Sequence, residues 1–284
     1  MYMRMAASAP HQSSRLDALR DQISKLESVL VCFSAGIDST LLLAVASEQL
    51  GEKAVGLTAV SPSLPESELA DARQIAKQLG VVVRFVESHE LDRPDYARNE
   101  ADRCFHCKTE LYGLAERQRV ELGLKCVVNG TNADDLGDYR PGLEAAQKAG
   151  IRSPLLDLGF TKAEVRAAAL EMGLQVWDKP AAACLSSRIP YGTSVTRERL
   201  AQIERFEANL KSLALGQVRV RWHDKIARIE VELQDIPRVV DPANRARIVE
   251  MGRDCGFQFI TLDLAGYRTG SLNELLAGRN LKLV

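Results

Sequence analysis

The sequence lacks a strong net charge of either sign, and it lacks a continuous apolar run long enough to span a membrane. With 37 lysines and arginines against 38 aspartates and glutamates, the formal net charge is -1, so no overall positive field favours tight nucleic-acid binding. Residues 1–14 also lack the apolar core of a signal peptide and are interpreted as a mobile leader. These absences predict a cytoplasmic protein whose partners include neither nucleic acid nor a membrane.

Cysteine is too scarce for a disulfide framework. Six cysteines in 284 residues, without a signal peptide, indicate thiols or metal ligands instead. A Walker loop is also missing, because no Gly-Lys-Ser/Thr follows the glycine turn at Gly36.

The order of apolar runs and helical patterns predicts the fold. Strand-like runs at residues 29–33, 54–60, 81–86 and 125–129 alternate with helices, which is typical of an α/β fold with a doubly wound parallel sheet. After residue 190 the pattern changes to a helix, two strands, a helix and a strand. We therefore expect a first domain over residues 15–190 and a smaller α+β domain over residues 191–284.

One strand-to-helix turn is the strongest functional signal, since small residues there let backbone N–H groups and a helix N-terminus approach an anion. A carboxylate within it suggests a divalent cation that accompanies a nucleotide. The alternative is an ordinary α/β turn capped by Ser39. The predicted nucleotide loop consists of Ser34, Ala35, Gly36, Ile37, Asp38, Ser39 and Thr40.

Three further segments carry polar groups whose meaning the residues leave open. Three aspartates after Gly130 and Thr131 indicate either magnesium and nucleotide contacts or a solvated turn with helix capping. Cys104 and Cys107 form a C-x-x-C, which on its own indicates either a pair of thiols without metal or half of a structural zinc site. The segment around Cys184 is a functional loop or a domain hinge.

Two arginines alternate along one predicted strand, so Arg219 and Arg221 lie on the same face. Two guanidinium groups side by side repel each other unless they share an anion, which indicates a phosphate or carboxylate pocket. The alternative is a pair of surface salt bridges to acids such as Glu230 or Glu232.

The nucleotide loop resembles the S-G-G-x-D-S loop of the N-type ATP pyrophosphatases, which cleave ATP between the α- and β-phosphates. It departs at Ala35, where we expect alanine to be tolerated only with negative φ. Further motifs over about residues 26–270 resemble the ATP-dependent sulfur transferases that build the nickel-pincer nucleotide, the cofactor of lactate racemase. These motifs are Asp-Tyr-Arg-Pro-Gly, Cys-Leu-Ser-Ser-Arg-Ile-Pro-Tyr-Gly-Thr, Val-Arg-Val-Arg-Trp-His and Ile-Ala-Arg-Ile-Glu.

This resemblance implies that ATP adenylylates a carboxylated pyridinium mononucleotide, and that sulfur then displaces AMP to give a thiocarboxylate. It assigns Mg²⁺ to Asp38, the substrate phosphate to Arg219 and Arg221, and an active-site loop to Ser187 and Arg188. It places acidic metal contacts at Glu207 and Glu230, and a second ATP-binding segment at Gly130 and Thr131. It also implies a homo-oligomer.

The sulfur source is open between two types of family member. Some sacrifice one loop cysteine, which aligns one residue farther from Ser-Ser-Arg than Cys184 does. Others hold a [4Fe-4S] cluster on three cysteines, leaving one iron open for a sulfide. Cys104, Cys107 and Cys184 favour the cluster type, whereas Cys32, Cys126 and Cys255 are interpreted as packing residues.

Other functions share the same ATP loop. A transfer-RNA thiolase is disfavoured by the neutral charge, and an amidating synthetase by the lack of room for a glutaminase domain. A nucleotide sensor with a structural C-x-x-C would bind ATP without releasing pyrophosphate.

Overall fold

A computed structural model describes residues 12–137, 141–180 and 182–268. Its contacts divide the chain into two units, one comprising residues 1–60, 66–88 and 107–182, and the other residues 61–65, 89–106 and 183–284. No helix within the described ranges is long and apolar enough to cross a membrane.

The first unit alternates strands and helices, with α5 extending across the division between the units. Its elements are α1 (Gln12–Ser24), β1 (Val29–Cys32), α2 (Ile37–Leu50), β2 (Ala54–Val60), α3 (Glu66–Leu79), β3 (Val83–Glu87), α5 (Arg103–Glu121), β4 (Cys126–Val128), α6 (Pro141–Lys148), α7 (Pro154–Asp157) and α8 (Lys162–Glu171). Residues 1–11 of the predicted leader lie outside the described residues, and its last three residues, 12–14, belong to the first turn of α1.

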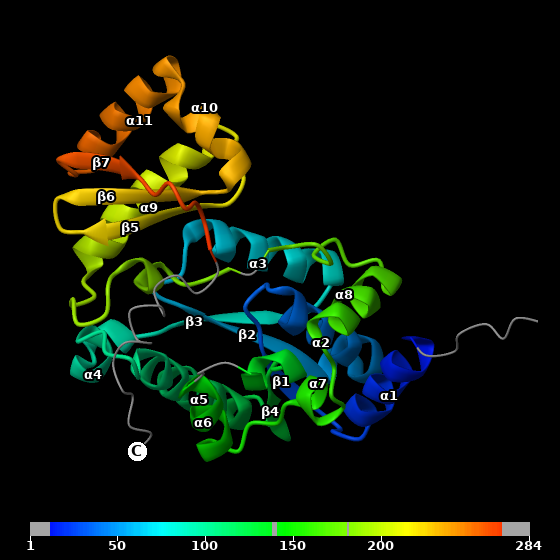
Figure 1. The fold of residues 1–284 in the computed structure, drawn as a ribbon. Helices are drawn as coiled ribbons and strands as arrows, with labels where there is room; N and C mark the ends of the chain where they lie inside the picture. The colour runs from blue at the N-terminus through cyan, green and yellow to red at the C-terminus, as the bar shows by residue number, and fades with distance from the viewer. Residues whose placement is uncertain (1–11, 138–140, 181, 269–284) are drawn as a thin grey trace, which may run out of the picture. The chain divides into compact units, whose positions relative to one another are not determined.

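The central sheet has the order β3-β2-β1-β4, and all three pairings are parallel (Figure 1). Every residue of β1 is buried, as expected for a strand covered on both faces. Val29 and Val31 point into the core that α1, α2 and α8 share, while Cys32 faces the side of α5, where Lys108 and Tyr112 lie close to it. The predicted doubly wound parallel sheet is therefore confirmed.

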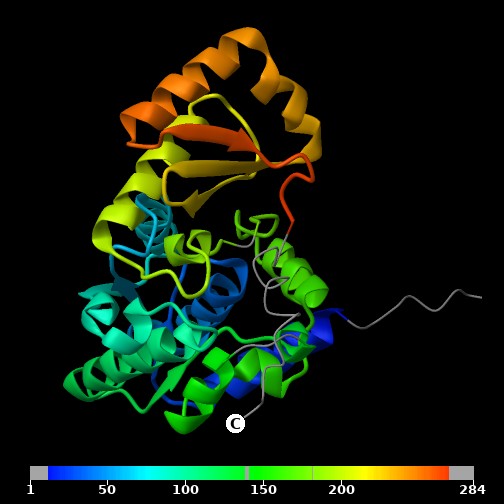
Figure 2. The ribbon, with the colours of Figure 1, turned by 60° about the vertical axis from the view of Figure 1, so that its left-hand side comes forward.

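The arrangement of helices matches this burial. Helix α2 packs against β1, β2, α1 and α8, and α5 with α6 lies on the opposite face of the sheet (Figures 1 and 2). Because β1 and β4 are parallel neighbours, the loops that follow their carboxyl ends meet at one edge of the sheet. These are the predicted nucleotide loop and the segment that starts at Gly130.

The second unit contains a mixed sheet of order β5-β6-β7, in which β6 pairs antiparallel with β5 and parallel with β7. Its elements are α4 (Pro94–Ala97), α9 (Arg197–Lys211), β5 (Val218–His223), β6 (Ile226–Val231), α10 (Ile236–Val240), α11 (Pro242–Asp254) and β7 (Phe259–Leu262). The predicted α+β order is confirmed here. Segments 61–65 and 89–106 also join this unit, so a domain boundary at residue 191 stays a prediction.

Candidate functional site

The nucleotide loop is closed by side-chain hydrogen bonds. Ser39 Oγ accepts a hydrogen bond from Ser34 N at 3.2 Å and donates to the Gly36 carbonyl at 3.1 Å. The two serine hydroxyls also lie 3.2 Å apart. Gly36 precedes α2 in extended conformation without a side-chain cap, so the helix N-terminus presents its N–H groups to an anion.

The backbone at Ala35 differs from our expectation of negative φ. Its φ is 57°, in the left-handed region, and the residue is fully buried. Alanine there costs about 1 kcal/mol of strain, which a glycine would avoid. The prediction of negative φ was wrong because the turn itself, and not the side chain, determines φ at this position.

Asp38 is already paired with a cation. Lys162 Nζ lies 2.5 Å from Asp38 Oδ2, and Asn132 Nδ2 donates to Asp38 Oδ1 at 2.9 Å. Lys162 is the first residue of α8, which begins with the predicted capping box of Thr161 and Glu164. The space beside the Asp38 carboxylate therefore suits a positive group, and the ammonium group of Lys162 occupies it in this structure.

The segment after β4 lies against the same loop. A Cβ atom on Gly130 would lie 2.8 Å from Ser39 N and 3.0 Å from the Asp38 carbonyl carbon. Only glycine allows this approach without a shift of the backbone. Thr131 N donates to Asn129 Oδ1 at 3.1 Å, which shapes the turn beside the loop.

We expect Gly130→Ala to lower the rate of ATP-dependent pyrophosphate release about 100-fold, because it displaces the loop by a fraction of an ångström or more. Gly113→Ala is the matched control, since its nearest neighbouring atom would lie 3.7 Å away. A pyrophosphate assay on both variants, with thermal melting as a check of folding, tests this. Equal rates for the two variants would contradict it.

The aspartates after Gly130 act in the turn. Asp134 Oδ2 accepts a hydrogen bond from Lys162 N at 2.8 Å, and Asp135 Oδ2 accepts one from Asn132 N at 3.0 Å. The capping interpretation therefore describes Asp134 better than the magnesium one. Asp138, the third aspartate, lies outside the described residues.

Lys179 also contacts the nucleotide loop, which sequence reasoning did not predict. Its Nζ lies 2.7 Å from Asp71 Oδ2, 2.9 Å from Glu68 Oε2 and 3.4 Å from the Ala35 carbonyl oxygen. Burial lowers the pKa of Lys179, but its hydrogen bonds to Asp71 and Glu68 outweigh this and raise it. A charged ammonium group is thus held against the loop.

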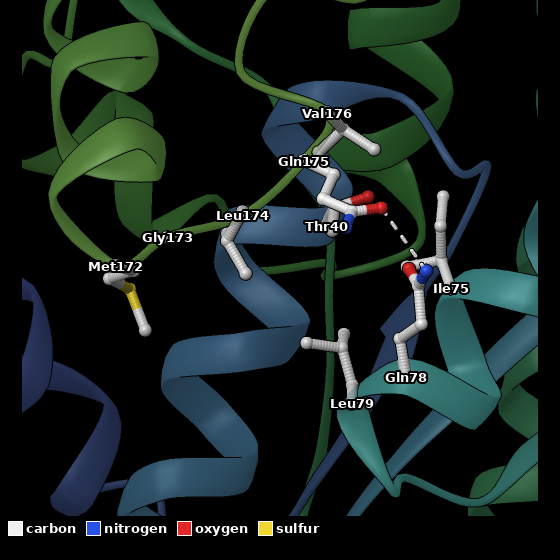
Figure 3. A pocket seen from close by; sticks show the side chains of 9 residues that line it. All are labelled: Thr40, Ile75, Gln78, Leu79, Met172, Gly173, Leu174, Gln175 and Val176. Carbon is white, nitrogen blue, oxygen red and sulfur yellow. Dashed lines mark hydrogen bonds between the residues drawn. The ribbon is translucent and has the colours of Figure 1, made fainter.

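Thr40, the last residue of the nucleotide loop, lies at a cavity. It lines a cavity of about 290 Å³ together with residues of α3 and the segment after α8, and Gln78 bonds Gln175 across it at 3.2 Å (Figure 3). Thr40 Oγ1 is buried without a hydrogen-bond partner in the described part of the chain. The predicted role of Thr40 as a hydroxyl donor to a nucleotide stays a prediction.

The six cysteines fall into two groups, and none of them forms a disulfide. Burial raises the pKa of Cys32 to about 12, and burial also raises the pKa values of Cys126 and Cys255. Cys104 is exposed, whereas Cys107, Cys184 and Cys126 are half-buried, so accessibility separates the predicted metal ligands from Cys32 and Cys255 but not from Cys126. Among the described residues, no group of three or more His, Cys, Asp and Glu side chains is arranged to hold a metal ion.

These environments predict different reactivities. In iron-free protein at pH 8, iodoacetamide is expected to modify Cys104, Cys107 and Cys184 first, because a thiol with a pKa of about 12, as at Cys32, is a thiolate only about once in 10⁴ molecules. Peptide mass spectrometry over a time course measures this order. Early modification of Cys32 would contradict it.

The predicted active-site loop is held by a buried ion pair. Arg188 is 2% exposed, and it donates from Nε and Nη2 to the two Glu207 carboxylate oxygens, both at 3.0 Å. Its Nη1 donates to the carbonyls of Ala183 and Cys184 and to Ser187 Oγ. In this structure Arg188 therefore holds the backbone on either side of Cys184.

The two strand arginines have different partners. Arg221 donates to Glu230 Oε2 at 2.7 Å and to the Ser187 carbonyl at 2.8 Å. Glu230 is therefore its partner, as the salt-bridge alternative has it, but the pair is buried and does not lie on the surface. Arg219 is 7% exposed and has no carboxylate partner among the described residues, while its guanidinium lies over the Tyr267 ring at 5.5 Å. Burial and the neighbouring charge of Arg188 lower the pKa of Arg219. This buried cation can therefore gain from an added anion.

The acidic residues assigned to metal contacts are engaged by arginine. Glu207 binds Arg188 and also accepts a hydrogen bond from Val220 N at 2.9 Å. Glu230 binds Arg221 through one oxygen and Arg228 through the other. Both carboxylates thus balance buried guanidinium charge here, and a divalent cation would have to displace these pairs.

A parallel sheet whose first strand leads through a seryl-glycyl loop to a helix N-terminus defines the first unit as a nucleotide-binding α/β unit of the pyrophosphate-loop class. The chain belongs to the asparagine synthase family, which matches residues 15–186.

The relatives extend the similarity over the second unit. The chain is 36% identical over 281 residues to the pyridinium-3,5-bisthiocarboxylic acid mononucleotide synthase of Lactiplantibacillus plantarum, covering 98% of this chain and 99% of the relative. It is 43% identical over 263 residues to an uncharacterized protein of Synechocystis sp., covering 93% of this chain and 98% of that protein. The resemblance read from the motifs is therefore confirmed.

Proposed function

We propose that the protein is an ATP-dependent sulfurtransferase that converts a carboxylate of a pyridinium dicarboxylate mononucleotide to a thiocarboxylate in nickel-pincer nucleotide biosynthesis. The observation that carries this proposal is the similarity to the synthase along the whole chain. In the first step, a carboxylate oxygen attacks the α-phosphorus of ATP and pyrophosphate leaves. In the second, a sulfur nucleophile attacks the acyl carbon and AMP leaves.

The first unit supports the adenylylation step. The nucleotide loop offers helix N–H groups and serine hydroxyls to the pyrophosphate, and Lys179 adds positive charge beside Ala35. Asp38 would hold Mg²⁺, because the place where Lys162 Nζ contacts its Oδ2 already suits a cation. Charge that builds up on the leaving pyrophosphate would be neutralised by these groups.

The second unit supports recognition of the mononucleotide. Arg219 is buried without an acid partner among the described residues, and a phosphate would supply the missing negative charge. Its neighbours Arg188 and Arg221 are each paired with a glutamate. Among these three arginines, the positive charge of Arg219 is therefore the one that is not balanced. A contact of Glu207 and Glu230 with a divalent cation also stays a proposal, and it is supported less well than their contacts with arginine.

Sulfur is proposed to come from a [4Fe-4S] cluster on Cys104, Cys107 and Cys184. The chemistry of the donor set suits a cluster, because all three thiols are accessible and two of them lie three residues apart on one face of α5. Binding would have to gather the three thiols, since the described side chains are not arranged around one point in this structure. Three thiolates leave one iron open, and the bound cluster would supply a sulfide as the nucleophile. The proposal includes a cytoplasmic location, a homo-oligomer and recharging by a sulfide donor.

Anaerobically prepared protein, incubated with ATP, Mg²⁺, sulfide and pyridinium-3,5-dicarboxylate mononucleotide, is expected to yield AMP, pyrophosphate and a product with one oxygen replaced by sulfur. Mass spectrometry and nucleotide chromatography measure these products. Ammonia in place of sulfide distinguishes an amidating enzyme. The absence of AMP under all these conditions would refute adenylylation, and loss of sulfur from Cys184 would refute the cluster as its source.

A further inference from the structure

Asn99 ties the segment after the cysteine loop to the region before α5. It is fully buried and has φ 60°, a left-handed conformation that asparagine tolerates better than most residues. Its Nδ2 donates to the carbonyls of Ile189 at 3.2 Å, Pro190 at 2.9 Å and Thr193 at 2.9 Å. Its own carbonyl accepts from Gly192 N at 2.9 Å. Few side chains could replace this set of bonds.

Arg103 extends the same network to the cysteines. It is 4% exposed, and its Nη1 donates to Asn99 Oδ1 at 2.5 Å and to the Ser186 carbonyl at 2.8 Å. It directly precedes Cys104 in the first turn of α5, while Ser186 lies two residues after Cys184. One guanidinium group therefore bridges the segments that carry these two cysteines.

The charge of Arg103 is not balanced by an acid. No carboxylate in the described part of the chain pairs with it, whereas Arg188 and Arg221 each bind a glutamate. A buried guanidinium without a counterion is costly, so an anion beside it stabilises the structure.

Two nitrogen atoms of the Arg103 guanidinium group are also available as hydrogen-bond donors. Its Nε and Nη2 make no hydrogen bond to any described residue, although the side chain is nearly buried. Hydrogen bonds and positive charge beside thiolates and inorganic sulfide are among the means by which proteins retain iron–sulfur clusters and adjust their reduction potentials.

We propose that Asn99 and Arg103 form a positioning pair that fixes the Cys184 loop to the turn carrying Cys104, and that Arg103 is the counterion and hydrogen-bond donor for sulfur held at these cysteines. This inference rests on the proposed function, because it requires a cluster at Cys104, Cys107 and Cys184. Arg103 acts through the sulfur ligands.

The test uses full-length protein reconstituted anaerobically with iron and sulfide. Arg103→Gln is expected to weaken cluster retention roughly 10–100-fold, as for other partners of metal ligands. Arg103→Lys keeps the charge and is expected to retain the cluster with an altered reduction potential and electron paramagnetic resonance spectrum. Both variants should still release pyrophosphate from ATP at the wild-type rate, since the nucleotide loop belongs to the first unit.

Two other variants serve as controls. Arg98→Gln removes an exposed arginine paired with Asp95 and should retain the wild-type iron content. Tyr96→Phe removes the 2.6 Å bond to Ser186 Oγ, so it loosens the same loop while the Arg103 side chain is retained. If Tyr96→Phe loses as much iron as Arg103→Gln, loop loosening explains the loss and the role of Arg103 is refuted.

The failures of the two proposals are distinguishable. Wild-type protein that binds iron while both Arg103 variants match it in iron content, spectrum and potential would overturn this inference alone. Wild-type protein that binds no iron would overturn the proposed cluster and this inference with it. Loss of iron in Arg103→Gln together with unchanged melting and unchanged pyrophosphate release supports the inference.

Discussion

Arg188→Met is expected to lower the free energy of unfolding by about 3–5 kcal/mol, because it leaves the buried Glu207 carboxylate without its counterion. Glu207 is 6% exposed and would keep only its hydrogen bond from Val220 N. The carbonyls of Ala183 and Cys184 would lose their shared donor as well. Urea unfolding followed by circular dichroism measures the change.

A matched surface variant and a double variant separate charge from packing. Arg197→Met removes an exposed arginine that lies 3.6 Å from Asp92, and it should change stability by less than about 1 kcal/mol. Arg188→Met combined with Glu207→Leu removes both buried charges and should recover most of the stability that the single variant loses. A single variant as stable as Arg197→Met would contradict the prediction.

The same double variant tests what the ion pair does for the reaction. Its Cys184 loop would lack the Arg188 donors to the Ala183 and Cys184 carbonyls even when the protein is stable. We therefore expect it to release pyrophosphate normally while sulfur transfer falls. Arg188 is thus placed as a residue that positions the loop, while a direct catalytic role for it and for Ser187 stays a prediction.

Local patterns in the sequence predicted the elements that local physics determines. The apolar run at β1, the capping box at Thr161 and the alternation of Arg219 and Arg221 each depend on neighbouring residues, and each was found as expected. The nucleotide loop could be recognised because its glycine, serines and aspartate are contiguous. The left-handed conformation of Ala35 could not be predicted, since alanine ordinarily has a negative φ.

The partners of the site residues could not be predicted, because they come from distant parts of the chain. Lys162 reaches Asp38 across 124 positions, and Asn99 reaches the Ile189 carbonyl across 90. A single lysine or asparagine is not part of a sequence pattern from which such a contact could be predicted. Glu207 was assigned to a metal for the same reason, since its pairing with Arg188 depends on how the loop folds onto α9.

The second large expected effect concerns Asp38, the partner of Lys162. Asp38→Asn is expected to lower the rate of ATP-dependent pyrophosphate release about 100–1,000-fold, because it removes the charge that would hold Mg²⁺ against the leaving group while keeping the side-chain shape. Asp21→Asn, which changes an exposed aspartate paired with Lys25, is the matched control and should leave the rate unchanged.

The dependence on Mg²⁺ decides between two roles for Asp38. If Asp38 binds the metal and Lys162 only occupies its place in the free protein, Asp38→Asn raises the Mg²⁺ concentration needed for half-maximal rate, and Lys162→Met lowers it or leaves it unchanged. If instead Asp38 serves only to hold Lys162, both variants slow the reaction equally at unchanged Mg²⁺ dependence, and the double variant is no slower than either. Asn132 Nδ2 donates to Asp38 Oδ1 and can still donate to the one side-chain oxygen that Asp38→Asn leaves, so loss of this bond does not explain either result.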